Sequence, residues 1–159
     1  MVEGEQPQMM DAPAIALAYV LHISHGPPPA DLVCLAEAVY HEAKTQTVKG
    51  QLAVAQVVLN RRKSPAFPQS ICAVVYQKTG NRCQFSWVCN ARTLRQVKDP
   101  LQWGVAQEIA RFALMGKLPD PTRGATYFHA SYVHPHWPHL QKTIKIGSHI
   151  FYKSRKETG

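Results

Sequence analysis

The chain has only ten acidic side chains among 159 residues, so each can be weighed as an acid catalyst. Glu37 and Glu42 share one segment, Leu32 to about Lys44, whose apolar residues recur at helical spacing. On that helix, Glu37 points away from the apolar stripe and should be solvated, whereas Glu42 falls at the edge of the stripe. A partly desolvated carboxyl has a raised pKa and suits proton donation. Glu42 is therefore the candidate general acid, and the alternative is a salt bridge at the helix end.

Two short stretches combine aromatic rings with polar groups, as clefts for polar ligands do. The candidate ligand-binding residues are Gln84, Phe85, Ser86, Trp87, Tyr127 and His129. If residues 127–129 form a strand, Tyr127 and His129 face a cleft and Phe128 faces the core. For Phe85 and Trp87 the alternative is burial in the core, where aromatic rings are often found.

The histidines suggest a rival chemistry. Four of the eight crowd into eleven residues: His129, His134, His136 and His139. Zinc enzymes use such clusters, so a zinc-dependent peptidase or amidase built on residues 129–139 is an alternative hypothesis. However, His41-Glu42 is not followed by the second histidine of an HExxH motif, and the later histidines lie among prolines. We expect no metal site and no cofactor.

The four cysteines, Cys34, Cys72, Cys83 and Cys89, include no CxxC pair. Cys34 lies in an apolar helical pattern and is predicted to be a buried thiol. Cys83 and Cys89 either close a small disulfide loop in an oxidising compartment or remain free thiols. Nothing in the local sequence supports a thiol nucleophile.

Several elements must position these groups. Asp31 is the expected N-cap of the helix carrying Glu42. Thr47 is expected to cap a helix over 48–62, whose apolar residues surround its circumference and predict a central, buried position. A short helix is expected over 69–76, an irregular stretch over 78–92, and a helix over 103–115 that ends at Gly116.

The last part of the chain differs in pattern. Residues 143–152 alternate between apolar and polar around Gly147 and Ser148, which predicts a β-hairpin. The chain is therefore expected to be α+β and mainly helical, with a small β-hairpin near its C-terminus. Residues 1–30 are expected to form a segment with a short helix over 12–24 and a Pro-rich linker, and residues 31–159 a single domain.

Charge and hydropathy limit the partners. Eighteen Lys and Arg against ten Asp and Glu give a net charge of +8, which favours an anionic partner such as nucleic acid or an acidic envelope polymer. The basic residues form no continuous stripe, which disfavours the alternative of a nucleic-acid-binding module. Residues 12–23 are too short for a membrane span and follow an acidic start, so we expect neither a membrane anchor nor an export signal.

Seven stretches carry a resemblance when taken in order along the chain. They are residues 35–43 (LAEAVYHEA), 50–61 (GQLAVAQVVLNR), 64–68 (SPAFP), 83–87 (CQFSW), 124–130 (GATYFHA), 133–137 (VHPHW) and 146–152 (IGSHIFY). Together they resemble the signature of SleB-type cell wall hydrolases, over roughly residues 32–153.

The resemblance implies a lysozyme-like catalytic domain that cuts the glycan strands of peptidoglycan as a muramidase or a lytic transglycosylase. It implies that Glu42, in Tyr40-His41-Glu42-Ala43, is the catalytic acid/base. It also implies a substrate groove at residues 84–87 and 127–129. A hydrolase normally adds a second carboxylate, for which Asp99 and Asp120 are candidates, whereas Asp120 alternatively stabilises a turn.

The resemblance also suggests a biological role. Proteins of this kind include spore-cortex lytic enzymes, wall hydrolases and phage endolysins. We expect a compact endolysin that is made in the host cytoplasm and acts as a monomer at the bacterial cell wall. Its partners would be peptidoglycan and the anionic cell envelope.

Overall fold

The computed structural model describes residues 29–93 and 96–158. Its α-helices are α2 (Ala30–Ala43), α3 (Val48–Lys63), α4 (Ile71–Val75) and α5 (Pro100–Leu114), with 3₁₀ helices η1 (Ser86–Cys89) and η2 (Arg155–Thr158). Its strands are β1 (Lys78–Thr79), β2 (Arg82–Cys83), β3 (Tyr127–Ala130), β4 (Leu140–Ile146) and β5 (His149–Ser154). The α+β class is thus confirmed. The helix expected over 12–24 lies outside the described residues.

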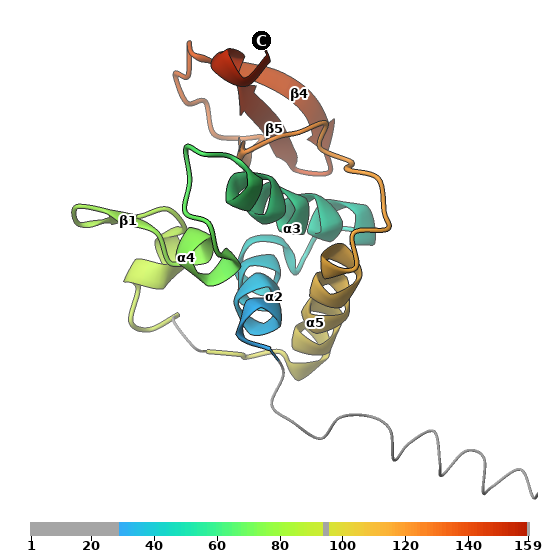
Figure 1. The fold of residues 1–159 in the computed structure, drawn as a ribbon. Helices are drawn as coiled ribbons and strands as arrows, with labels where there is room; N and C mark the ends of the chain where they lie inside the picture. The colour runs from blue at the N-terminus through green and yellow to red at the C-terminus, as the bar shows by residue number, and fades with distance from the viewer. Residues whose placement is uncertain (1–28, 94–95, 159) are drawn as a thin grey trace, which may run out of the picture.

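Helix α2, which carries Glu42, forms the centre of the helical layer. Figure 1 shows it flanked by α4 and α5, with α3 lying between these helices and the sheet. Leu35, Val39 and Tyr40 of α2 are buried, and the Tyr40 hydroxyl accepts hydrogen bonds from the backbone N–H groups of residues 98 and 99. Glu42 is therefore held on a helix with contacts on several sides.

Helix α3 is buried on most of its surface, as its sequence predicts. Ala55, Val58 and Leu59 pack into the cluster formed with α2 and α5. Ala53 and Val57 pack into a second cluster with the sheet. The Thr47 side chain caps the helix by accepting from the N–H of Gly50 at 3.2 Å, which confirms the expected N-cap. An apolar circumference is explained by apolar partners on both sides.

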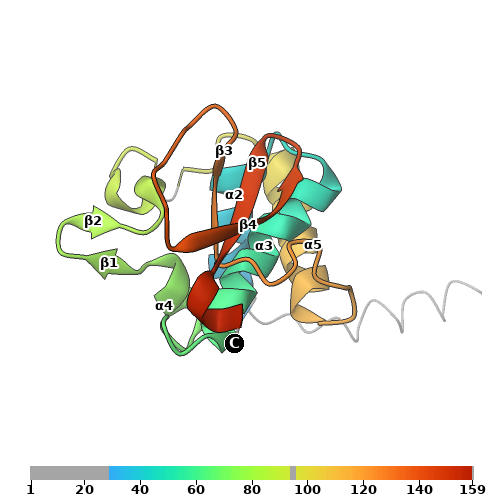
Figure 2. The same ribbon diagram turned by 90° about the horizontal axis from the view of Figure 1, so that it is seen from above.

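The C-terminal sheet is antiparallel in the order β3-β5-β4, so β3 lies at an edge. Figure 2 shows it from above, lying over α3. The predicted hairpin is confirmed: β4 and β5 are joined by Gly147 and Ser148, and Gly147 has a φ of 56°. A Cβ on Gly147 would lie 2.5 Å from the side-chain oxygen of Gln46, which also accepts from the Ser148 N–H. Because glycine has no Cβ, Gln46 of the α2–α3 loop can approach the turn closely enough to hydrogen-bond to the hairpin.

Two helix starts differ from the prediction. The expected N-cap Asp31 is wrong: α2 begins at Ala30, directly after Pro29, and Asp31 lies in the first turn without a capping hydrogen bond. The negative charge of Asp31 still interacts favourably there with the positive end of the helix dipole. Helix α5 begins at Pro100 rather than residue 103, because proline is tolerated at the first helical position and Asp99 caps the Gln102 N–H.

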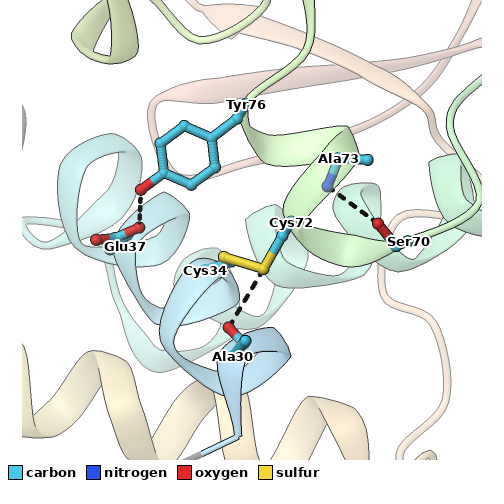
Figure 3. Close-up of a disulfide and its surroundings, with 7 residues drawn as sticks. All are labelled: Ala30, Cys34, Glu37, Ser70, Cys72, Ala73 and Tyr76. Carbon is cyan, nitrogen blue, oxygen red and sulfur yellow. Dashed lines mark hydrogen bonds between the residues drawn. A yellow bond between two sulfur atoms is a disulfide. The ribbon is translucent and has the colours of Figure 1, made fainter.

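The cysteines form two disulfides, Cys34–Cys72 and Cys83–Cys89. Figure 3 shows that the first joins α2 to α4. Cys34 is buried as predicted, but its expected state as a thiol is wrong, because α4 brings Cys72 beside it. Of the two alternatives for Cys83 and Cys89, a disulfide or free thiols, the structure shows the disulfide.

Glu37 is a second correction on α2. It is half-buried rather than solvated, because Tyr76 at the end of α4 covers it and donates its hydroxyl hydrogen to the carboxylate (Figure 3). The helical pattern alone does not reveal this, since the covering residue lies 39 positions further along the chain.

Candidate active site

A cleft of about 430 Å³ opens where the helical layer meets the edge strand β3. Its walls come from the ends of α2 and α3, the loop that follows β2, strand β3, the loop after it, and the start of β5. The lining residues are Glu42, Arg61, Cys83, Gln84, Phe85, Ser86, Tyr127, Phe128, His129, Ala130, Tyr132, Trp137 and His149. The structure thus brings the predicted acid together with five of the six predicted ligand-binding residues.

Glu42 lies in the last turn of α2, half-buried at the cleft. Burial raises the pKa of its carboxyl, and the raising effect outweighs the interactions with Trp87 and Arg61, which lower the pKa. The negative end of the α2 dipole also favours the protonated form. A carboxyl that keeps its proton toward neutral pH can donate it to a bound ligand.

Arg61 extends from the last turn of α3 and is only 3% exposed. Its Nε–H donates to the Thr126 carbonyl at 2.6 Å, and its guanidinium lies 5.2, 5.3 and 5.7 Å from the ring centres of Phe67, Phe85 and Tyr127. Burial lowers the pKa of Arg61 to about 10, so it remains cationic at neutral pH. This buried cation is part of the electrostatic environment of Glu42.

The loop over 83–89 forms one wall, and the disulfide between Cys83 and Cys89 closes it. Gln84 and Ser86 are exposed, so their polar groups are available to a ligand, while Phe85 also lines the cleft but is only 4% exposed. The expectation that Trp87 lines this groove is wrong. Trp87 is 7% exposed and packs in the helical core against His41, Tyr76 and Phe85.

Strand β3 forms the opposite wall. Tyr127, Phe128 and His129 pair with Tyr152, Phe151 and Ile150 of β5. Tyr127 and His129 line the cleft as expected, but Phe128 lines it too while packing against both core clusters, so the expected division between a cleft face and a core face is corrected. The His129 Nδ1 lies 2.7 Å from the Ala130 carbonyl, which can only accept, so Nδ1 carries a proton. In the neutral ring, Nε2 then accepts from the Tyr152 hydroxyl at 2.9 Å. His129 can therefore offer a ligand its ring, but neither of its nitrogens is unpaired.

The second-carboxylate candidates both have structural partners. Asp99 caps α5. Asp120 accepts hydrogen bonds from the backbone N–H groups of Thr122 and Gly124 and from the side chains of Asn60 and Thr122. These bonds lower the pKa of Asp120 against the opposing effect of burial. Among the described residues that line the cleft, Glu42 is the one carboxylate.

The histidine cluster does not converge. Within residues 29–93 and 96–158, no group of three or more His, Cys, Asp or Glu side chains could hold a metal ion. His134, His136 and His139 are exposed, and His129 is bonded to Ala130 and Tyr152. The geometry therefore gives the zinc-dependent alternative no set of ligands.

We accordingly expect the wall cleavage that the sequence resemblance implies to survive exhaustive dialysis against EDTA, because Glu42 can donate a proton without a metal. The measurement is the rate at which a suspension of purified peptidoglycan clears, before and after treatment. Full loss of the rate, restored by zinc, would instead support the histidine cluster.

The site contains residues that the sequence analysis did not select: Arg61, Tyr132, Trp137 and His149. Arg61 had a detectable signal, because it follows Val54, Val57 and Val58 at helical spacing and so had to share their buried face. Trp137 contacts Tyr127, His129 and Tyr152 through ring pairs 5.4 to 6.1 Å apart. No local pattern predicts that contact.

A larger hollow lies elsewhere, along α5 and the start of α3, with a volume of about 850 Å³. Its walls are mainly apolar, and its carboxylate, Glu108, is exposed and paired with Arg111 at 3.4 Å. Volume alone does not indicate chemistry, so the smaller, polar cleft at Glu42 is the candidate active site.

A proton-donating carboxyl in a cleft of aromatic rings, amides and hydroxyls is typical of enzymes that act on carbohydrate polymers. Residues 45–152 match the family model described as Cell Wall Hydrolase. The chain therefore belongs to the Cell Wall Hydrolase family. The matched range begins three residues after Glu42, so the assignment of the family does not by itself include the candidate acid.

Curated relatives and solved structures agree with the family. The chain is 34% identical over 125 residues to a spore cortex-lytic enzyme of Halalkalibacterium halodurans and 34% identical over 123 residues to one of Bacillus subtilis. Each match covers 76% of this chain, but only 34% and 37% of the relatives. The chain thus spans little more than a third of the length of these relatives.

The fold matches the catalytic domain of the germination-specific lytic transglycosylase SleB from Bacillus anthracis, with a TM-score of 0.64 and 28% identity. That match covers 82% of this chain and 100% of the solved domain. The catalytic domain of the Bacillus cereus SleB protein matches with a TM-score of 0.64 and 29% identity over 81% of this chain and 94% of that one. The similarity is therefore to the catalytic part of these proteins.

Proposed function

We propose that the chain cleaves the glycan strands of peptidoglycan as a lytic transglycosylase, with Glu42 as the acid and then the base. The observation that carries the proposal is the half-buried Glu42 carboxyl, with its raised pKa, in the polar cleft. The family and the likeness to a lytic transglycosylase domain support the substrate and the reaction class.

In the first step, the Glu42 carboxyl donates its proton to the glycosidic oxygen, and the bond from that oxygen to C1 of muramic acid breaks. In the second step, the C6 hydroxyl of the same sugar attacks C1, and the Glu42 carboxylate takes the hydroxyl proton. A 1,6-anhydro ring forms, no water is consumed, and Glu42 returns to its starting state. The absence of a second carboxylate among the described lining residues favours this route over hydrolysis.

Mass spectrometry of digested peptidoglycan tests this proposal directly. Transglycosylation leaves 1,6-anhydromuramic acid ends, which are lighter by one water than the reducing ends left by hydrolysis. We expect anhydro ends as the main product. Reducing ends would shift the assignment to a muramidase, and cut peptide stems with intact glycan would overturn glycan cleavage altogether.

We further propose that the protein acts at the bacterial cell wall, as a monomeric endolysin attracted by the anionic envelope. The net charge of +8 supports the electrostatic part of this proposal. The two disulfides support a site of action outside the reducing cytoplasm. No helix among the described residues has both the length and the apolar character needed to cross a membrane.

A further inference from the structure

The loop from β3 to β4, residues 131–139, brings to the cleft an indole that the proposed mechanism does not use. Figure 2 shows this loop as a wide arc that leaves the end of β3 and returns to the start of β4. Trp137 lies in it, half-buried, and lines the cleft. Its carbonyl accepts from the Leu140 N–H at 3.1 Å, and Pro138 after it favours an extended backbone at Trp137. The indole is therefore presented from an anchored end of the loop.

Trp137 rests on rings of the sheet without being covered by a parallel one. Its ring centre lies 5.4 Å from that of His129, 5.5 Å from that of Tyr152 and 6.1 Å from that of Tyr127. The ring planes are inclined to the indole by 75°, 87° and 57° in the same order. A steeply inclined ring cannot cover a whole indole face. Since Trp137 also lines the cleft, part of the indole is open to a ligand with a flat apolar face.

The rings that support Trp137 are themselves fixed. His129 stacks on Tyr152 with ring centres 5.3 Å apart and planes inclined by 27°. The His129 Nε2 lies 2.9 Å from the Tyr152 hydroxyl, and its Nδ1 lies 2.7 Å from the Ala130 carbonyl. The position of the indole is thus set before a ligand arrives, which reduces the entropy lost on binding. His129 acts here as a support for Trp137.

We propose that Trp137 is a substrate-binding residue whose indole stacks on an N-acetylhexosamine ring of the glycan strand, next to the sugar whose bond is cleaved. This inference rests on the proposed function. A pyranose ring has faces made of C–H groups and a rim of hydroxyl and amide groups. An apolar indole inside a polar cleft matches both features. The exposed Gln84 and Ser86 on the opposite wall can serve the polar rim.

Ring contacts place Trp137 apart from the reacting groups. The Arg61 guanidinium lies over the rings of Phe67, Phe85 and Tyr127, whereas Trp137 contacts His129, Tyr152 and Tyr127. Tyr127 is thus the one ring that the two sets share. A sugar on Trp137 is therefore a neighbour of the reacting sugar. Its contact is the same in the bound substrate and in the transition state, so it lowers KM and leaves kcat unchanged.

The test is Trp137→Leu, which keeps an apolar side chain but removes the flat ring. With soluble glycan strands as substrate, we expect KM to rise by about tenfold or more, as for a tryptophan anchor, and kcat to stay within about twofold. The matched control is Trp103→Leu on α5, a half-buried indole outside the cleft that contacts Tyr40. It should leave KM unchanged, whatever its effect on the melting temperature. A lowered melting temperature with unchanged KM in Trp137→Leu would make Trp137 a structural residue and overturn the inference.

A second measurement uses the wild-type protein and does not depend on how a variant folds. The ¹⁵N-labelled indole N–H resonance of Trp137, identified by its loss in Trp137→Leu, is followed while the β-1,4-linked tetramer of N-acetylglucosamine is added. It should shift in a saturable manner, and the Trp103 resonance should not move. An unshifted Trp137 resonance together with an unchanged KM would overturn the inference and leave the proposed function intact. Substantial cleavage by Glu42→Gln would instead overturn the proposed function.

Discussion

Glu42→Gln should lower the rate of wall cleavage by about a hundredfold or more while leaving the fold and wall binding intact. The amide keeps the size of the carboxyl and can still hydrogen bond, but it cannot donate a proton to the glycosidic oxygen. Among the described residues that line the cleft, no other carboxylate could donate the proton in place of Glu42. The measurements are the clearing rate of purified peptidoglycan, the melting temperature, and the fraction of protein that sediments with the wall.

The matched control for this substitution is Glu108→Gln. Glu108 is an exposed residue of α5 that pairs with Arg111 at 3.4 Å, so its loss should leave activity near wild type. Glu37→Gln is a poorer control, because Glu37 accepts a hydrogen bond from Tyr76. If Glu42→Gln kept substantial activity, both the residue and the mechanism would have to be abandoned.

Phe151→Ala should destabilise the fold by about 3–5 kcal/mol, because it removes a large buried ring. Phe151 is fully buried on β5 and packs with Ala53 and Val57 of α3 and with Phe128 of β3. For a domain of this size, that loss corresponds to a fall in melting temperature of about 10 °C. Differential scanning calorimetry measures the change.

The same substitution at an exposed phenylalanine separates burial from side-chain type. Phe112 on α5 is 51% exposed, so Phe112→Ala should change the melting temperature by a small fraction of the Phe151 effect. Equal effects at the two positions would contradict the assignment of Phe151 to the core between α3 and the sheet.

Elements with strong periodic patterns could be predicted from the sequence. The apolar circumference of α3, its Thr47 cap and the hairpin at Gly147 and Ser148 are all present. In these elements the residues that determine the structure are near neighbours in the chain. The Asp31 cap was wrong because Pro29 and Ala30 can begin a helix without a side-chain cap.

The errors at the site share a different cause. Cys34 meets Cys72, and Glu37 meets Tyr76, across 38 and 39 positions of sequence. A helical pattern shows which face of α2 is apolar, but not which residues of α4 cover the other faces. Trp87 was misplaced for the same reason, because its polar neighbours Gln84 and Ser86 suggested a groove while the packing of His41 and Tyr76 put its ring in the core.

The residues missed at the cleft also depend on long-range packing. Trp137 and His149 reach the site because β5 pairs with β3. The sequence analysis predicted β3 as a strand only conditionally. Arg61 was overlooked for another reason: the sequence analysis did not use its spacing from Val57 and Val58, which places it on the buried face of α3. The family resemblance led to Glu42, and the structure adds the cation and the rings around it.

The positions of the two disulfides give the domain an order of unfolding. The Cys34–Cys72 bond ties α2 to α4, and the Cys83–Cys89 bond closes the loop over 83–89 on itself. No disulfide reaches the sheet, which packing and the hydrogen bonds between Gln46 and Ser148 hold against the helical part. A disulfide limits the freedom of the unfolded chain only within the loop that it closes. Heat or denaturant should therefore detach the sheet first. One wall of the cleft belongs to the helical part and the other to the sheet. A molecule with a detached sheet would therefore keep Glu42 in a folded helix but would no longer bind the glycan.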